Sequence, residues 1–242
     1  SHAVHLPRVL RHSADHETSL FDGVVIMLET IIEDIEQLRF AAWRNVLESF
    51  LQDVARREKR QIAPPSFEEY VDIFLFSVEE SSVERSVSHL SLLGASPSAS
   101  FVSPNASLTA TPYVGLHKFL QTRGIVLPTG SPADAEVMET HYGLANAKVS
   151  ELEHLTTTRD VRPCAGVVEC LRSLLNNGVR VVIASRTRSL KLLLGRAGLQ
   201  LPDVVTIAGE EVRARRLRWR PHIDLYVAAA SKMHIPIDRC AV

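Results

Sequence analysis

The sequence predicts an α/β protein with a Rossmann-like parallel sheet core and an inserted helical cap domain. Two patterns indicate this fold class. After about residue 156, strand and helix patterns alternate in short units, as in a parallel sheet covered by helices on both faces. A block of helical periodicity separates these units from the first strand candidate. We therefore divide the chain into an N-terminal arm with the first core strand (1–28), a helical cap (29–155) and the core (156–242).

The composition is that of an ordinary globular protein. The 242 residues are 45% apolar and 23% charged, with a formal net charge of -1, and such a chain can bury a sizeable core. No apolar stretch approaches the roughly 18–20 residues that span a bilayer, and the N-terminal segment has no apolar run of signal-peptide length. The cysteines Cys164, Cys170 and Cys240 lack metal spacing, which favours a reducing compartment. We predict a cytoplasmic protein that binds neither membrane nor nucleic acid.

The first half of the chain contains one strand candidate and then helices. Residues 20–28 form an apolar strand candidate, and residues 29–60 repeat apolar side chains at three- and four-residue steps, which indicates a helix. Ser66 follows two prolines and is placed to cap a further helix. Residues 77–111 contain eleven serines among 35 residues. We predict that most of this serine-rich segment is a mobile insertion, because it offers little apolar surface to bury.

The second half contains the alternating units. Helices are predicted over residues 113–124, 133–142 and 148–155, with Gly143 as a stop between the last two. The core elements then follow in this order: helix 166–177, strand 180–184, helix 189–197, strand 204–208, helix 223–233, and a strand that opens at residue 240.

The strand over residues 180–184 ends abruptly at Ser185, and a helix begins shortly afterwards. Free backbone N–H groups and the helix dipole favour an anion at such a position. The pattern indicates a phosphate-handling enzyme, with Ser185 as a phosphate ligand. The plainer interpretation is that Ser185 caps the helix, and both roles are compatible.

Five segments, taken together and in this order, resemble the haloacid dehalogenase superfamily of phosphohydrolases, in its β-phosphoglucomutase-like branch. The segments are Phe21-Asp22-Gly23-Val24-Val25, Phe40-Ala41-Ala42-Trp43-Arg44, Tyr142-Gly143-Leu144-Ala145-Asn146-Ala147-Lys148, Val181–Ser185, and Arg220-Pro221-His222-Ile223-Asp224-Leu225-Tyr226. The family motifs span most of residues 20–242 apart from the serine-rich segment.

This resemblance implies a phosphatase or phosphomutase that acts on a small sugar phosphate through an aspartyl nucleophile with Mg²⁺. The family motif D-x-D-G stands at the end of the first strand, where the first Asp attacks phosphorus and the second is the acid/base. Carried onto this chain, the resemblance makes Asp22 the catalytic carboxylate and a Mg²⁺ ligand. Ser185 and Arg220 would hold the phosphate, and Lys148 and Arg44 would reach the substrate from the cap.

The chain also departs from the family pattern. Asp22 is alone where the family has two carboxylates, Arg220 replaces a lysine, and the acidic pair that binds Mg²⁺ would follow Val242. These departures support an alternative function, a catalytically inactive member that binds a ligand or partner. A third interpretation attributes the serine-rich segment and the disturbed first motif to an imperfect gene model.

Each candidate residue has a simpler explanation. Asp22 starts an Asp-Gly turn signal, while Lys148 and Arg44 fit solvated helix positions. The arginines between residues 213 and 220 lack the interleaved aromatics of a nucleic-acid site. The chain has no Walker loop, G-x-G-x-x-G or G-x-S-x-G motif, which argues against nucleotide-binding and serine-hydrolase alternatives.

Overall fold

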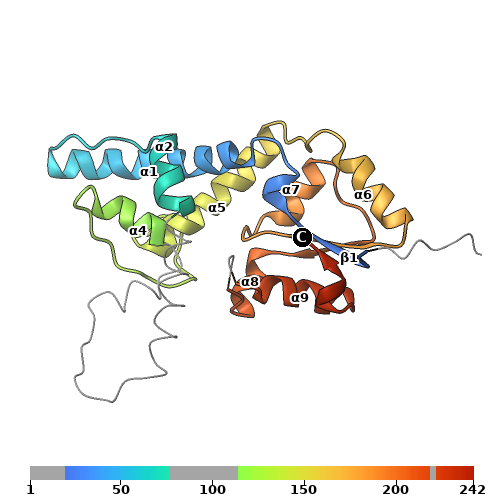
Figure 1. Cartoon of the computed structure of the whole chain (residues 1–242). Helices are drawn as coiled ribbons and strands as arrows, with labels where there is room; N and C mark the ends of the chain where they lie inside the picture. The colour runs from blue at the N-terminus through green and yellow to red at the C-terminus, as the bar shows by residue number, and fades with distance from the viewer. Residues whose placement is uncertain (1–19, 77–113, 219–221) are drawn as a thin grey trace, which may run out of the picture.

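The computed structural model describes residues 20–76, 114–218 and 222–242, and its core is a parallel sheet (Figure 1). Four strands pair in the order β3-β2-β1-β4. They are β1 (Gly23–Met27), β2 (Arg180–Ala184), β3 (Val204–Ile207) and β4 (Cys240–Ala241). All pairings are parallel, with Met27 beside Ala184 in the central pair. The predicted α/β class with a Rossmann-like core is confirmed.

Helices cover both faces of the sheet (Figure 1). One face packs against α6 (Val167–Asn176) and α7 (Leu190–Arg196), and the other against α8 (Gly209–Ala214) and α9 (Asp224–Met233). Alternate residues of β2 divide between the two apolar clusters, because successive side chains of a strand point to opposite faces. Val181 and Ile183 join the first cluster, and Val182 and Ala184 join the second. This two-sided burial explains why β2 reads as a continuous apolar run.

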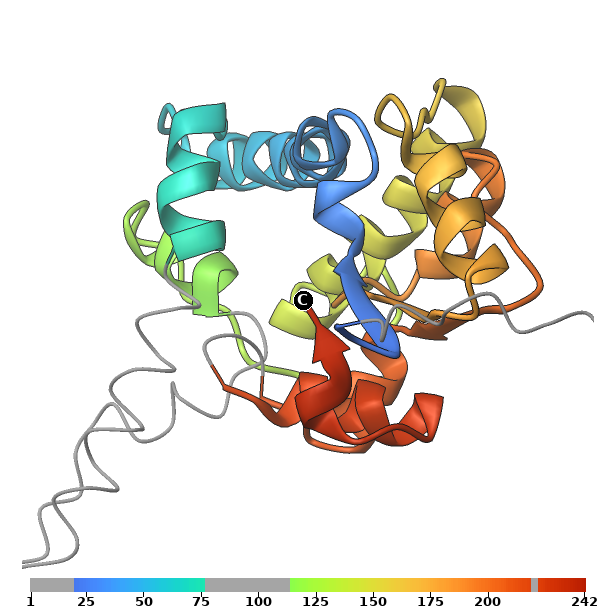
Figure 2. The same ribbon diagram turned by 45° about the vertical axis from the view of Figure 1, so that its right-hand side comes forward.

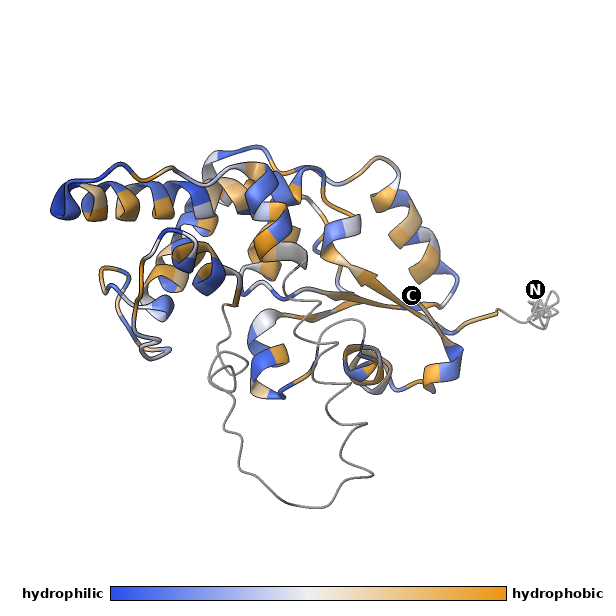
Figure 3. Cartoon of the chain, turned by 60° about the vertical axis from the view of Figure 1, so that its left-hand side comes forward, coloured by the Kyte–Doolittle hydropathy of each residue, from blue (hydrophilic) through white to orange (hydrophobic). Residues whose placement is uncertain are grey.

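The described helices between β1 and α6 form a helical lobe, which lies beside the sheet (Figure 2). Its elements are α1 (Ile35–Glu58), α2 (Phe67–Tyr70), the π-helical segment η2 (Val71–Phe76), α4 (Val114–Gln121) and α5 (His141–Thr158). The lobe has its own apolar cluster, built around Trp43, Leu47, Tyr70, Phe119 and Leu144. Figure 3 shows the apolar sides of these helices turned towards one another. The predicted boundaries at residues 28 and 155 stay predictions.

Helix α5 differs from the two helices predicted over residues 133–142 and 148–155. One continuous helix replaces them, and residues 133–140 form turns and bends. Gly143, the expected stop, lies in the first turn of α5, where its N–H donates to Thr140 Oγ (2.9 Å). A Cβ at residue 143 would lie 2.1 Å from the Met138 carbonyl oxygen. Glycine is therefore needed for close backbone approach and does not end the helix.

The remaining elements are short. The 3₁₀ turn η1 (Leu28–Thr30) follows β1, and η4 (Ile237–Arg239) precedes β4. Ser66 caps α2 as predicted, since its side chain accepts a hydrogen bond from the Glu69 N–H (3.1 Å). The helix α8 was not predicted, because its arginines read as a basic loop. The serine-rich segment predicted over residues 77–111 lies outside the described residues. Within the described ranges, no helix combines the length and apolarity that crossing a membrane requires.

Candidate functional site

The carboxyl ends of β1 and β2 bring two polar residues together. Because Met27 pairs with Ala184, the residues that follow each strand meet at the same edge of the sheet. Ser185 is fully buried there and its Oγ lies 3.3 Å from Glu29 Oε1. The Ser185 N–H donates to the Ile207 carbonyl oxygen (3.0 Å), which fixes the turn after β2. Ligands of open α/β sheets bind at this edge.

Arg39, from the first turns of α1, joins the helical lobe to this edge. Its Nη2 donates to Glu29 Oε1 (2.7 Å) and Ser185 Oγ (3.1 Å), and its Nη1 donates to Glu36 Oε1 (2.5 Å). The hydroxyl of Tyr70 donates to Glu36 Oε2 (2.9 Å). A continuous polar network therefore runs from the strand ends to the aromatic cluster of the lobe.

The network shifts the pKa values of its members. Burial opposes ionisation of Glu29, but the charge and hydrogen bonds of Arg39 hold the pKa of this carboxyl below its usual value. Burial next to Glu36 raises the pKa of Tyr70, which keeps its phenol protonated. Glu29 Oε2 is buried and has no hydrogen-bond partner among the residues that the structure describes. An uncompensated carboxylate oxygen is costly, so the ionised form of Glu29 depends on the contacts that Arg39 makes with its other oxygen.

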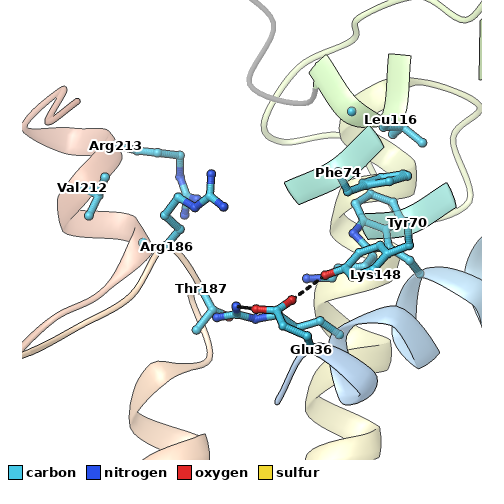
Figure 4. Close-up of a pocket in the computed structure, with 13 residues that line it drawn as sticks. Glu36, Tyr70, Phe74, Leu116, Lys148, Arg186, Thr187, Val212 and Arg213 are labelled. Atoms are coloured by element: carbon cyan, nitrogen blue, oxygen red, sulfur yellow. Dashed lines mark hydrogen bonds and ion pairs between the residues drawn. The ribbon is translucent and has the colours of Figure 1, made fainter. Parts of the chain in front are cut away.

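A crevice of about 280 Å³ opens between the network, the lobe and the sheet edge. Figure 4 shows Arg186, Thr187, Val212 and Arg213 on the core side, opposite the side chains of the lobe. The lining residues are Glu36, Arg39, Trp43, Tyr70, Phe74, Gly115, Leu116, Lys148, Arg186, Thr187, Gly209, Val212 and Arg213. Four cations and one carboxylate line this crevice, so it suits an anion.

Two of these cations have lowered pKa values. Loss of water around the Lys148 amine, reinforced by the nearby charge of Arg39, lowers the pKa of Lys148 to about 7. The same two causes lower the pKa of Arg186, which stays protonated because free guanidinium groups titrate above about 12. An anion in the crevice would favour the charged form of both groups.

Asp22 lies neither beside Ser185 nor in the lining of this crevice, and its role as the catalytic carboxylate stays a prediction. Asp22 precedes β1, at the opposite edge of the sheet, and its carboxylate receives two hydrogen bonds from Arg239 (2.9 and 3.0 Å). The Asp-Gly pair begins the strand instead of ending it. The family spacing D-x-D-G, counted from the end of β1, falls on Met27-Leu28-Glu29-Thr30.

Met27 therefore stands at the position that the resemblance gives to the nucleophile, and Glu29 stands at the acid/base position. Met27 is 5% exposed and packs among apolar side chains of the face covered by α8 and α9. Its thioether has no proton to lose and no anionic oxygen. The signal that could have located this motif is the charge of Glu29, which is the first after the apolar run Val24–Leu28.

Of the other predicted site residues, two lie at this site, one lies away from it, and one is outside the described residues. Ser185 and Lys148 lie at the network and in the crevice, respectively. Arg44 does not, because it lies on the outer surface of α1, 52% exposed and 3.6 Å from Glu48. Arg220 lies outside the described residues.

Sequence reasoning missed Arg39, Arg186 and Arg213 as site residues. Arg39 precedes Trp43 by four residues, so both project from the same side of α1. This spacing could have indicated that Arg39 shares the lobe's inner surface. Arg186 follows Ser185 directly at the end of β2 and was visible in the motif. Arg213 belongs to α8, the helix that was not predicted.

The residues at the strand ends do not fit Mg²⁺. Within the part of the chain that the structure describes, no three His, Cys, Asp or Glu side chains lie together as a metal site. Glu29 is already paired with Arg39, and Asp22 with Arg239. Mg²⁺ prefers an octahedral set of oxygens, and neighbouring guanidinium groups repel a cation.

Comparisons with known proteins agree with the described fold. No family model matches the chain. Two β-phosphoglucomutases, from Mycobacterium bovis and Mycobacterium tuberculosis, are each 28% identical over 128 residues, which is 53% of this chain and 49% of theirs. The chain thus spans about half the length of the curated relatives it matches. A hydrolase from Pseudomonas syringae shares the fold with a TM-score of 0.53 at 16% identity, over 90% of this chain and 74% of that chain.

Proposed function

We propose, on the premise that this chain is of the haloacid dehalogenase superfamily and its β-phosphoglucomutase-like branch, that it binds a small phosphorylated sugar in the crevice. The observation that carries this proposal is the cationic lining of a cavity at the carboxyl edge of the sheet. Arg186, Arg213 and the buried Ser185 would receive the phosphate, and Lys148 and Trp43 would contact the sugar from the lobe. Guanidinium groups suit phosphate because they donate parallel hydrogen bonds.

Phosphoryl transfer, as a phosphatase or phosphomutase, is the activity that the relatives support. In this chain it would rely on Glu29, whose Oε1 lies 3.3 Å from Ser185 Oγ. Glu29 could take or give a proton only if Arg39 moved from its Oε1, since Arg39 keeps the carboxylate ionised. Magnesium dependence remains a prediction of the resemblance.

Binding without turnover is the second candidate, and Met27 favours it. A methionine at the end of β1 cannot form the aspartyl phosphate that the resemblance implies. The charged crevice would still bind the phosphate ester. Both candidates share the ligand and differ in whether inorganic phosphate is released.

One experiment separates these possibilities. Calorimetry with a panel of hexose and pentose phosphates measures binding, and a phosphate-release assay with Mg²⁺ or EDTA measures turnover. Replacement of Arg186 by Met should weaken binding about 10-fold or more, the typical worth of a charged hydrogen bond. Arg44→Met is the matched control, because Arg44 lies outside the crevice.

The outcomes are distinct. Phosphate release that depends on Glu29 supports the enzyme, and binding without release supports the second candidate. Equal, unchanged affinity in the Arg186→Met and Arg44→Met proteins would remove the phosphate site from this crevice.

A further inference from the structure

Lys148 has an unusual position for a lysine. It projects from α5 into the crevice, on the wall that faces Arg186 and Arg213 (Figure 4). Its Nζ lies 5.7 Å from the centre of the Trp43 ring. Phe74 and Leu116 line the same wall, so the aliphatic stem and the amine lie against apolar surface.

The Lys148 amine is not paired with a carboxylate among the described residues. Among the residues described by the structure it forms neither an ion pair nor a hydrogen bond, and the nearby Glu36 is taken up by Arg39 and Tyr70. The charged groups that face it from neighbouring elements are Glu36 and Arg39 of α1, and Arg186 and Arg188 of the segment after β2. Burial and the three arginines disfavour the ammonium form, and Glu36 opposes them only in part.

A lysine in such surroundings is a nucleophile. Desolvation and adjacent cations are the two devices that activate lysine amines towards carbonyl carbon. With its pKa near 7, roughly half of the Lys148 amine is neutral at pH 7, against about 0.04% for an ordinary lysine of pKa 10.4. A neutral Lys148 amine can therefore attack a carbonyl carbon, whereas a charged ammonium could only pair with a phosphate.

We propose that Lys148 forms an imine with the carbonyl carbon of a small phosphorylated aldehyde or ketone, whose phosphate lies across the crevice against Arg186 and Arg213. The amine lone pair attacks the carbonyl carbon to give a carbinolamine, which loses water as the C=N bond forms. Hydrolysis reverses the step, and no oxidant or reductant is required. The phosphate part of this inference rests on the proposed function; the reactivity of the amine does not.

The test is reductive trapping on the folded, full chain. The protein is incubated with glyceraldehyde 3-phosphate and cyanoborohydride from pH 6 to 9, and modification of each lysine is quantified by peptide mass spectrometry. Lys191, which is exposed on α7, is the internal control. We expect Lys148 to be modified at least about tenfold faster than Lys191 at pH 7, with a midpoint near its lowered pKa.

Two comparisons test whether the phosphate group directs the labelling of Lys148, and one variant tests whether the labelling occurs at this amine. Glyceraldehyde without phosphate should trap Lys148 more slowly, and inorganic phosphate should protect Lys148 but not Lys191 from the phosphorylated probe. Lys148→Arg has no imine-forming amine at residue 148, so labelling at this position should disappear while Lys191 is labelled at its wild-type rate.

Equal labelling of Lys148 and Lys191 in protein that still binds sugar phosphates would overturn the imine and leave the proposed function intact. Selective labelling that phosphate does not suppress, by both aldehydes alike, would overturn the phosphate-directed capture and the proposed phosphate site together.

Discussion

Each of the two edges of the sheet carries a carboxylate paired with an arginine, but the two pairs differ in how far they are exposed to solvent. At the amino edge, Asp22 and Arg239 form a two-pronged ion pair that is 47% and 39% exposed. At the carboxyl edge, Glu29 and Arg39 form a pair that is 22% and 12% exposed, and it extends to Ser185 and Glu36. An exposed ion pair contributes little to stability, whereas removal of one partner of a buried pair is strongly destabilising, because it leaves the other charge buried and unpaired. A carboxylate beside an arginine thus indicates a site only where the surrounding fold removes water.

Removal of Arg39 is the strongest test of this contrast. Arg39→Ala leaves Glu29 and Glu36 without their shared cation, so we expect the free energy of unfolding to fall by about 2–4 kcal/mol. Urea unfolding followed by circular dichroism measures it. Arg57→Ala is the control on the same helix, because Arg57 makes an exposed pair with Glu139; its midpoint should match that of the wild type. Equal losses in both variants would show that the network has no special stabilising role.

A second expected effect concerns the alkaline pH dependence of stability. The pKa of Lys148 is lowered to about 7 in the folded chain, so between pH 7 and 10 the unfolded chain binds more protons and stability rises with pH. The slope from this group is at most about 1.4 kcal/mol per pH unit. Lys148→Met should lack this component, and Lys191→Met should retain it. Parallel stability curves for wild type and Lys148→Met would contradict the lowered pKa.

A third effect lies on the acid side. Glu29 has a lowered pKa in the folded chain, so its contribution is present above the unfolded pKa of about 4.3 and is lost as pH falls through the folded value. Glu29→Gln should therefore be less stable at pH 7 by about 1–2 kcal/mol, and the difference should shrink as the pH falls below about 4. Chemical unfolding between pH 3 and 7 measures this. A constant difference across that range would mean that Glu29 acts through packing and not through its charge.

The difference between the edges also explains which predictions succeeded. Apart from α8, the main strands and helices after residue 166 were predictable, because each is a local pattern of apolar residues bounded by glycine or a polar turn. Asp22 was misplaced because the strand was taken to include the Asp-Gly pair, and a two-residue turn signal does not say whether it begins or ends a strand. Counting from the last residue of β1 places the motif on Glu29.

The polar network of Glu29, Arg39 and Ser185 could not be predicted from local sequence patterns. Glu29 and Ser185 are 156 positions apart, and only the pairing of β1 with β2 brings them together. Lys148 was found from the resemblance as a charged contact, but its lowered pKa depends on its burial and on the charge of Arg39. Both follow from the packing of α1 against α5. Burial and neighbouring charge are properties of the assembled crevice.

The smallest expected effect belongs to Asp22 and sharpens the contrast from the other side. Asp22→Asn removes an exposed charge whose pKa is lowered by Arg239, at the edge of the sheet away from the crevice. Affinity for sugar phosphates, any phosphate release and the urea midpoint should all stay at wild-type values, since exposed ion pairs contribute little. Calorimetry on Asp22→Asn beside Glu29→Gln makes the comparison within one assay. Loss of binding or turnover in Asp22→Asn with Glu29→Gln unaffected would reverse the assignment and return the catalytic carboxylate to the amino edge.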